Sequence, residues 1–499
     1  MSDFRDLVDL AVDKLGGHVL WASDDFFAGK ENLLKSAAAV FLEHEYTDRG
    51  KWMDGWESLR KRAVGRDIRD EAIIRLGVPG IVRGVVVDTS FFRGNFPEAF
   101  ELEACQMRSD TSVEVLQSSA TEWVKLEPRT PLEGNTLNFF DVSSEFIATH
   151  LRLIIYPDGG VARLRVHGTV APDWRALGGA KNEIDLAALE SGGEVLSCSD
   201  MFFGPKHNLI APGRAANMSD GWETKRRRGV NAETHDWAVV KLAGEGTIER
   251  IEIDTNHFKG NFPDTAAIDG GATADGPWVV VVPRVKLMAH TRHVFAEELS
   301  LHGPFTHVRM RVFPDGGVSR LRVFGRLNEV GKADALARHV NGLGQRALEG
   351  HLRACCAANA WVRAMSRSRP FTSGSQLLEI ADATWKALPR EAWLEAFAAH
   401  PRIGETKAST QRETKWSASE QGTARRASSQ TLSSVAIANA QYEEKFGWVF
   451  LINATGKTGA DILHVMRSRL HNTPQAELSV AAEELRQIMN LRLLKLIGG

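Results

Sequence analysis

Hydrophobic and polar residues alternate along much of the first two thirds of the chain. In the run that begins at His150 (HLRLIIYPDGGVARLRVHG), Arg152, Arg163 and Arg165 alternate with apolar residues. A period of two is typical of β-strands, and this alternation predicts one apolar and one basic face. The Pro-Asp-Gly-Gly segment between the two halves predicts a hairpin turn. Because short strands with turn signals are many and helical stretches few, we expect an all-β sandwich of the jelly-roll type.

The β pattern occurs twice. Four blocks recur in the same order: GGHVLWASDDFFAGKENL (16–33) as GGEVLSCSDMFFGPKHNL (192–209), Asp-Gly-Trp-Glu (54–57) at 220–223, Gly-Asn-Phe-Pro (94–97) at 260–263, and the His150 run at His307. The offset between the copies falls from 176 to 166 to 157, so the copies differ by deletions between the blocks. A repeat of about 160 residues is a whole domain rather than a solenoid unit. The sequence therefore predicts two related β-domains, residues 1–175 and 176–330.

From about residue 338 the apolar spacing changes to three and four, which predicts an all-α domain over residues 338–499 after a linker at 326–337. Cys355 and Cys356 lie within this helical run and are interpreted as small core residues. Near the end of the chain one helical stripe contains an arginine among core positions: Leu485, Ile488, Met489, Arg492 and Leu496. Because a buried guanidinium without a partner is costly, we expect Arg492 to face an internal carboxylate or a bound anion.

Bulk properties narrow the function classes. The 499 residues carry a formal charge of −2, with 43% hydrophobic and 25% charged residues, which is ordinary for a soluble globular protein and argues against nucleic-acid binding. No apolar run is long enough to span a membrane, and the N-terminal segment lacks the apolar core of a signal peptide. The four cysteines are scattered, which predicts a reducing, cytoplasmic compartment. We expect small-molecule partners, no nucleic acid, no membrane, and a homo-oligomer.

Acids and arginines cluster beside the Asp-Gly-Trp blocks of both copies. The matched sets are Asp54, Glu57, Arg60 and Arg62 in the first copy, and Asp220, Glu223, Arg226 and Arg228 in the second. Arginine forks bind carboxylates in a bidentate manner, so the cluster predicts an anionic substrate. A solvated charged face remains an alternative. Likewise, Trp56 and Trp222 fit either a site or a turn followed by a core tryptophan, and the Pro-Asp-Gly-Gly segment is interpreted as turn chemistry.

Three histidines occur only in the second copy. His207, His235 and His257 stand opposite Glu31, Arg69 and Phe91 of the first copy. If only one copy is catalytic, the second is favoured, because it has more side chains that can act as general acid or base. The candidate hydrolytic residues are therefore His257, Asp220 and Glu223, and the candidate substrate-binding residues are Arg226, Arg60 and Trp222.

Several of these blocks, in order and each present twice, resemble the allantoicase family across residues 1–330: SDDFF, DGWE, DT-x-x-F-x-GN-x-P and PDGG-x-x-R-L-R-V-x-G. The resemblance implies two jelly-roll, galactose-binding-like sandwiches that hydrolyse allantoate to (S)-ureidoglycolate and urea. Such hydrolysis needs a base to activate water or an acid to protonate the departing urea, and cations to hold the carboxylate. The site residues above rest on residue chemistry alone, and a divalent metal ion is left open. The alternative is a metabolite- or sugar-binding module attached to a monofunctional decarboxylase.

The third domain contains a histidine on the apolar face of a helix. His400 follows Trp393 and Phe397 at helical spacing, and Pro401 ends the helix. By itself this position fits a core or capping histidine as well as a catalytic one. The segment Ser417-Ala418-Ser419-Glu420 equally fits a capping box at the start of a helix. An oligomerisation domain is a further alternative for this region, and Arg492 on an apolar stripe argues against it.

Together the blocks of the third domain resemble the OHCU (2-oxo-4-hydroxy-4-carboxy-5-ureidoimidazoline) decarboxylase family over residues 338–498: WVRAM-x-x-x-RPF, WLEAFAAHPRIG, S-x-x-EQ, FGWVFLINATG, RLHN-x-x-x-x-E and NLRLLKL. The resemblance implies cofactor-free decarboxylation to (S)-allantoin. It also implies catalytic and substrate-binding residues: His400 and Glu420 for catalysis, with Pro401, Ser417, Gln421, Ile452 and Arg492 around the substrate.

The chain departs from the decarboxylase pattern in two places. Asn453 and Thr455 stand where the family usually has cysteine and arginine, and residues 421–425 replace a glycine-rich stretch. We expect these departures to affect substrate affinity more than activity. In one chain, the two resemblances predict a bifunctional enzyme of purine catabolism.

Overall fold

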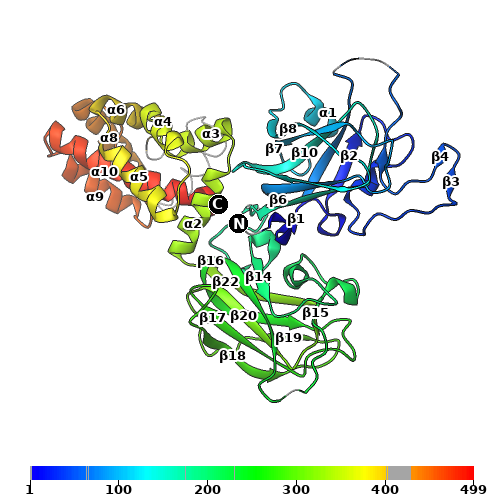
Figure 1. Cartoon of the computed structure of the whole chain (residues 1–499). Coiled ribbons are helices and arrows are strands. Elements are labelled where there is room, and N and C mark those ends of the chain that lie inside the picture. Colours follow the sequence, from blue (N-terminus) through cyan, green and yellow to red (C-terminus); the bar gives the residue numbers. More distant parts are fainter. Residues whose placement is uncertain are drawn as a thin grey trace. The chain divides into compact units, whose positions relative to one another are not determined.

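The computed structural model describes residues 3–62, 65, 67–174, 176–229, 231–400, 402 and 429–498 (Figure 1). The chain forms two compact units, Met1–Gly331 and Lys332–Gly499. The first unit is built from β-strands and contains both repeats, and the second is helical. The predicted fold class, two β-sandwich domains followed by an all-α domain, is confirmed. None of the helices in the described ranges is long and apolar enough to cross a membrane.

Repeat 1 is organised around one strand of 19 residues, β6 (Asp70–Asp88). The other elements of repeat 1 are β1 (Val8–Asp9), β2 (His18–Ala22), β3 (Tyr46–Thr47), β4 (Gly50–Lys51), β5 (Trp56–Glu57), β7 (Ala99–Cys105), helix α1 (Val113–Gln117), β8 (Val124–Pro131), β9 (Leu137–Asp141), β10 (Ile147–Tyr156), β11 (Gly160–Val161) and β12 (Arg163–Val170). The first half of β6 pairs with β2 and β10, and β7 and β8 continue that layer. The second half of β6 pairs with β9 and β12, and β1 extends this second layer. Because β6 belongs to both layers, it joins the two sheets of the sandwich.

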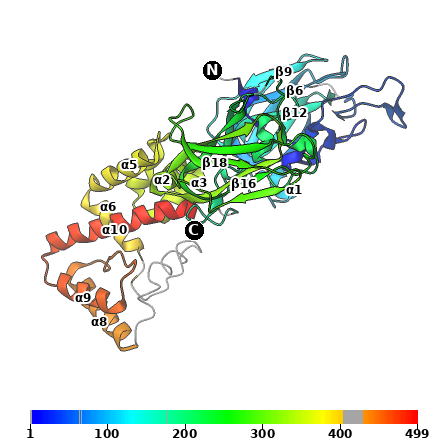
Figure 2. The ribbon, with the colours of Figure 1, turned by 90° about the horizontal axis from the view of Figure 1, so that it is seen from below.

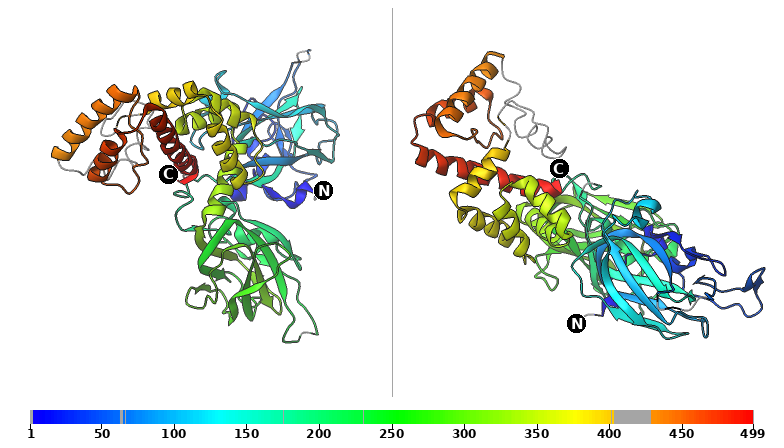
Figure 3. Two further views of the ribbon diagram at one scale, coloured as in Figure 1. Left: turned by 90° about the vertical axis from the view of Figure 1, so that its left-hand side faces the viewer. Right: turned by 90° about the horizontal axis from the view of Figure 1, so that it is seen from above.

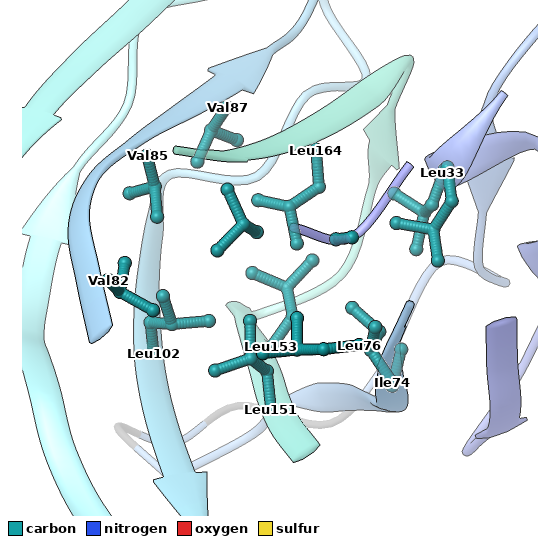
Figure 4. Close-up of a cluster of buried hydrophobic side chains, with 14 of the residues drawn as sticks. Leu33, Ile74, Leu76, Val82, Val85, Val87, Leu102, Leu151, Leu153 and Leu164 are labelled. Atoms are coloured by element: carbon teal, nitrogen blue, oxygen red, sulfur yellow. The ribbon is translucent and has the colours of Figure 1, made fainter. Parts of the chain in front are cut away.

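The core of repeat 1 lies between these two layers (Figure 4). Leu151 and Leu153 of β10 face it from one side, and Val85 of β6 and Leu164 of β12 face it from the other (Figure 4). All four side chains are fully buried, and burying a side chain of this size contributes about 2 kcal/mol to folding. The period-two pattern in the sequence therefore marks the inward positions of both layers.

The Pro-Asp-Gly-Gly segment is not a hairpin turn between paired strands, so that prediction is wrong. Strands β10 and β12 do not pair with each other; each pairs with a different half of β6, and the short β11 between them pairs with β5. The segment thus carries the chain from one layer of the sandwich to the other. Sequence alternation could not show this, because a strand with one apolar face looks the same whether its partner lies beside it or in the opposite layer.

The predicted basic face of these strands is also wrong in part. Arg163 is buried, and its guanidinium bonds the Asp54 carboxylate at 2.7 Å. Arg152 pairs with Glu103, and Arg165 lies 3.6 Å from Asp9. These arginines neutralise acids of their own domain rather than forming an open cationic surface.

Repeat 2 has the same topology around its own 19-residue strand, β16 (Asp236–Asp254). Its other strands are β13 (Ile184–Asp185), β14 (Glu194–Cys198), β15 (Trp222–Glu223), β17 (Thr265–Gly271), β18 (Val279–Lys286), β19 (Arg292–Phe295), β20 (Phe305–Phe313), β21 (Gly317–Val318) and β22 (Arg320–Leu327). Helix α1 and the β3–β4 pair of repeat 1 have no counterpart among the described residues of repeat 2. Strands β3 and β4 form a hairpin that projects from the rim of the repeat 1 sandwich (Figure 3), within the stretch where the sequence offset falls from 176 to 166.

The helical unit contains α2 (Glu329–Asn341), α3 (Gln345–Cys355), α4 (Asn359–Arg367), α5 (Gly374–Lys386), α6 (Arg390–Ala399), α8 (Ser429–Phe446), α9 (Gly459–Arg469) and α10 (Pro474–Gly498). The long helix α10 packs against α3, α5 and α8 (Figure 2). Cys355 and Cys356 are buried, as predicted, although α3 ends at Cys355 and Cys356 caps it. The predicted linker at 326–337 is instead the end of β22 and the beginning of α2.

Candidate functional site

The three histidines specific to repeat 2 all bond backbone carbonyls. His257 Nε2 donates to Ala215 O at 3.0 Å, His207 Nε2 to Asp6 O at 2.9 Å, and His235 Nδ1 to Glu233 O at 2.8 Å. Burial lowers the pKa of His207 to about 4, so this imidazole is held neutral. Each ring thus fixes a loop of the structure through one of its nitrogens.

The other predicted residues of repeat 2 have separate surroundings. Asp220 accepts from the Ala216 amide at 2.9 Å and lies 3.5 Å from Lys14 of repeat 1. Trp222 is fully buried, and its indole N–H donates to Asp200 O at 2.8 Å, as Trp56 does to Asp24 O at 2.7 Å in repeat 1. Both tryptophans therefore have the surroundings of core residues.

The predicted arginines are exposed in both repeats. Arg226 in repeat 2 and Arg60 in repeat 1 lie at the surface, and the charge of Arg60 acts on Glu57. The assignment of His257, Asp220, Glu223, Arg226, Arg60 and Trp222 to one hydrolytic site stays a prediction.

A glutamate–asparagine pair is common to both repeats. In repeat 1, Asn95 Nδ2 donates to Glu57 Oε1 at 2.7 Å, and in repeat 2 Asn261 donates to Glu223 in the same way. Glu57 lies on the short strand β5, opposite Gly160 of β11, and Gly160 donates to Asn95 O at 2.7 Å. A Cβ on Gly160 would lie 1.9 Å from the ring of Phe92, so only glycine allows this approach. The repeated Asp-Gly-Trp-Glu, Gly-Asn-Phe-Pro and Pro-Asp-Gly-Gly motifs therefore meet to position one carboxylate.

In repeat 1 this carboxylate lines a pocket of about 710 Å³. The pocket is lined by Phe27, Phe41, Glu43, Lys51, Met53, Glu57, Phe91, Arg93, Gly94 and Asn95. Burial raises the pKa of Glu57, while the hydrogen bond from Asn95 and the charge of Arg60 act in the opposite direction. A buried carboxyl with a raised pKa, in a pocket that Lys51 and Arg93 also line, is a suitable acid–base group for an anionic substrate.

The wall of this pocket comes from the β3–β4 hairpin and the segments that flank it. Lys51 Nζ donates to the Glu43 carbonyl and lies over the rings of Tyr46 and Phe41, 4.6 and 5.1 Å from their centroids. The Phe41 ring stacks on Phe91 with centroids 5.6 Å apart. At the tip of the hairpin, Arg49 donates to Phe26 O at 2.8 Å. The wall carries no repeated motif, so the sequence patterns do not predict it; the fall in offset between the copies is the one sign of it in the sequence.

The pocket does not have the donor set of a metal site. Among the residues that the structure describes, no group of three His, Cys, Asp or Glu side chains is placed to hold a metal ion. The pocket contributes the carboxylates of Glu43 and Glu57, and one oxygen of Glu57 already accepts from Asn95. No catalytic step is therefore derived through a metal ion.

In the helical unit, two predicted residues from distant parts of the sequence lie together. Arg492 of α10 is buried, and its Nη2 lies 3.4 Å from His400 Nε2 at the end of α6. His400 caps α6 in an extended conformation, as expected for a residue before proline. Arg492 lies among buried apolar side chains of its own helix, Ile488, Met489 and Leu496. Burial also raises the pKa of the nearby Cys356 thiol to about 12, against the charge of Arg492. Pro401, Ser417, Glu420 and Gln421 lie outside the described residues.

Ile452 is buried in the segment between α8 and α9, and its neighbours are held by an ionic network. Arg469 donates to Leu451 O at 2.8 Å and to the buried Glu477, and Glu484 accepts from the Asn453 amide at 2.7 Å. Tyr442 and Asn472 also donate to Glu477. Arg469 of the RLHN-x-x-x-x-E motif thus fixes the backbone before Ile452, and Glu484, seven residues beyond the motif, fixes the backbone after it. Trp448 of the same segment lies against Phe397 of α6, the helix that ends at His400.

Comparison with known proteins shows that the β-sandwich unit and the helical unit each match a known family. The family model described as Allantoicase repeat matches residues 8–171 and 184–328, and the model described as OHCU decarboxylase matches residues 341–494. A probable allantoicase of Pseudomonas fluorescens is 45% identical over 338 residues, which cover 66% of this chain and 98% of that protein. The crystal structure of allantoicase from Saccharomyces cerevisiae is 35% identical, with a TM-score of 0.53, and the match covers 64% of this chain and 92% of the yeast chain.

These matches cover the two units separately. The two family models describe enzymes, so an interpretation of the sandwiches as a simple binding module is not favoured. The chain belongs to the allantoicase family and, since an OHCU decarboxylase domain follows in the same polypeptide, it is a bifunctional enzyme of purine catabolism.

Proposed function

We propose that the β-sandwich unit hydrolyses allantoate to (S)-ureidoglycolate and urea, and that the helical unit converts OHCU to (S)-allantoin. The observation that carries the second assignment is the contact of Arg492 with His400, 3.4 Å apart in apolar surroundings. A guanidinium beside an imidazole provides an anion-binding group next to a proton donor. That combination suits the decarboxylation of a carboxylate-bearing substrate.

The proposed decarboxylation uses the residues of the chain in three roles. Arg492 binds the substrate carboxylate, and the C–C bond to it breaks as carbon dioxide leaves. The electron pair is delocalised into the carbonyl and imine of the substrate ring, so this route requires no cofactor. His400 delivers a proton to the carbon that lost the carboxylate, with Glu420 as its predicted orienting partner. The apolar surroundings favour loss of the charged carboxylate over its solvated state.

The two reactions are not consecutive. Allantoin is a cyclic product, and its ring must be opened by a separate hydrolysis before allantoate exists as a substrate. Direct transfer of an intermediate between the units is therefore not part of the proposal, and common regulation of the two activities is the simpler reason for one chain.

Two further parts of the proposal concern surroundings and partners. A cytoplasmic location is supported by the cysteines, of which Cys105, Cys198 and Cys356 are free thiols. We expect small ureido acids as ligands and a homo-oligomer as the assembly.

The decarboxylase assignment is tested by His400→Ala in the full chain. The rate of (S)-allantoin formation, followed by circular dichroism, should fall at least about 100-fold in this variant, because removal of a proton-transfer group typically lowers the rate by about 10²–10⁴-fold. His464→Ala, on the exposed side of α9, is the matched control and should behave as the wild type. Unchanged (S)-allantoin formation by the His400→Ala variant would refute the assignment.

A further inference from the structure

The surroundings of the shared glutamate–asparagine pair differ between the two copies of the β-domain. The shared Glu57–Asn95 pair of repeat 1 lies in a cavity of about 710 Å³, together with two cationic side chains, Lys51 and Arg93. Among the described residues Arg93 has no ion-pair partner, and Lys51 uses one of its three N–H groups on the Glu43 carbonyl. Both cations therefore retain donors for an anionic ligand.

Repeat 2 has the same pair but not the same surroundings. Its counterpart of the hairpin segment is ten residues shorter and, among the described residues, contains no strand pair like β3 and β4. Counted back from the shared Asp-Gly-Trp-Glu block, the uncharged Asn217 stands opposite Lys51. At the position of Phe91, which stacks on the hairpin, repeat 2 has His257 in the same left-handed backbone conformation, with its ring bonded to Ala215 O. The Glu223–Asn261 pair consequently lacks the wall and one of the two cations.

Resting on the hydrolase activity proposed above, we infer that repeat 1 carries the catalytic site, with Glu57 as its acid–base residue and Lys51 and Arg93 as the carboxylate anchors. Asn95 is a positioning residue, because its donation to Glu57 Oε1 fixes the orientation of the carboxylate. Repeat 2 is then a structural copy. This location differs from the sequence-based expectation, which favoured repeat 2 for its histidines.

The reaction balances with these residues and water. Water attacks the carbon that carries the two ureido groups, a C–O bond forms, and one C–N bond breaks. Glu57 accepts the proton that water loses and donates it to the nitrogen of the departing urea. Burial raises the pKa of Glu57, which makes its carboxylate a better acceptor for the proton that it later returns. Lys51 and Arg93 hold the substrate carboxylate during the transfer, and the stacked rings of Phe41 and Phe91 form an apolar side of the pocket.

The test uses matched substitutions of the full chain in the two repeats, with urea release from allantoate as the readout. Glu57→Gln keeps the size of the side chain and an oxygen that can accept from Asn95, and it should lower kcat by at least about 100-fold. Glu223→Gln, the same change in repeat 2, should leave kcat nearly unchanged.

A second pair tests the anchors without risk to the core, because both residues are exposed. Arg93→Met should raise KM for allantoate about tenfold or more with little change in kcat, as expected for loss of a charge-assisted hydrogen bond. Lys259→Met in repeat 2 should change neither constant.

Each outcome of these assays has one meaning. If the wild-type chain releases no urea from allantoate, the proposed hydrolase function fails. If the wild type is active but Glu57→Gln retains its kcat, or Glu223→Gln loses activity to the same extent, the location in repeat 1 is overturned. An unchanged KM for Arg93→Met would overturn the role of that residue as an anchor.

Discussion

A histidine begins the best-conserved stretch between the two repeats, and in repeat 1 it is fully buried. His150 lies on β10, its Nδ1 is 2.9 Å from Thr149 Oγ1, and among the described residues its Nε2 has no hydrogen-bond partner. Burial, together with the charge of Arg75, lowers the pKa of His150 from 6.5 to about 4. The folded state therefore holds the ring neutral.

This burial predicts an acid-sensitive domain. Because the unfolded chain binds a proton at His150 below about pH 6.5 and the folded state only near pH 4, the free energy of unfolding of repeat 1 should fall by up to about 3 kcal/mol across that window. Calorimetry, which can resolve the transitions of separate domains, should show a smaller pH dependence for His150→Leu than for the wild type. His18→Leu, at an exposed position of the same domain, should leave the pH dependence unchanged. An equal pH dependence in all three proteins would contradict this account.

At the level of single residues, the sequence was most informative where a charged side chain occupied a position that the apolar pattern assigns to the core. Arg492 on an apolar stripe predicted an internal carboxylate or a bound anion, and the structure places it 3.4 Å from the imidazole of His400. The arginines of the repeats misled, because alternation alone cannot distinguish an exposed cation from one such as Arg163 that is buried on Asp54. Lys51 and Arg93 carried no signal of their own, since a lysine or arginine in a polar loop is usually a solvated surface residue.

Among the elements of the structure, the segment between α8 and α9 depends on charges buried elsewhere. Glu477 is fully buried and accepts from Arg469, Tyr442 and Asn472, and Arg469 in turn holds Leu451 O next to Ile452. Removing one partner of such a buried pair leaves the other charge uncompensated, which typically costs about 3–5 kcal/mol.

We therefore expect Glu477→Gln to lower both the stability of the helical unit and its decarboxylase activity. Calorimetry should show the loss of stability, and (S)-allantoin formation should decline because Leu451 and Ile452 are held less firmly. Glu483→Gln on the same helix removes a partly exposed partner of Arg486 and should cost no more than about 1 kcal/mol. Equal losses of stability and activity in the two variants would show that burial of the Glu477 network does not determine the size of the effect.

The elements that sequence reasoning mispredicted share one property. They are connections or insertions whose structure depends on the path of the chain between strands and layers, and not on a local hydrophobic period. These elements are the Pro-Asp-Gly-Gly turn, the 326–337 segment and the β3–β4 hairpin. Strand and helix patterns identified the layers and the core, because burial imposes a period on the sequence. The path between layers, and a wall built from an insertion, leave no such period.

For the whole molecule, the chain combines two compact units that each match a different enzyme family. The duplication within the first unit explains its architecture, and a difference between its copies explains where the pocket lies. The three histidines found only in repeat 2 form hydrogen bonds to backbone carbonyls. The ten additional residues of repeat 1 belong to the segment that forms the wall of the pocket, which contains a carboxylate present in both copies.

The central claim, that separate residues of one chain perform two independent reactions, is tested most directly by assaying both reactions on the same preparations of Glu57→Gln and His400→Ala. The account predicts that Glu57→Gln loses urea release from allantoate and keeps (S)-allantoin formation, and that His400→Ala shows the reverse. Loss of both activities in either variant, with both units still folded by calorimetry, would contradict it.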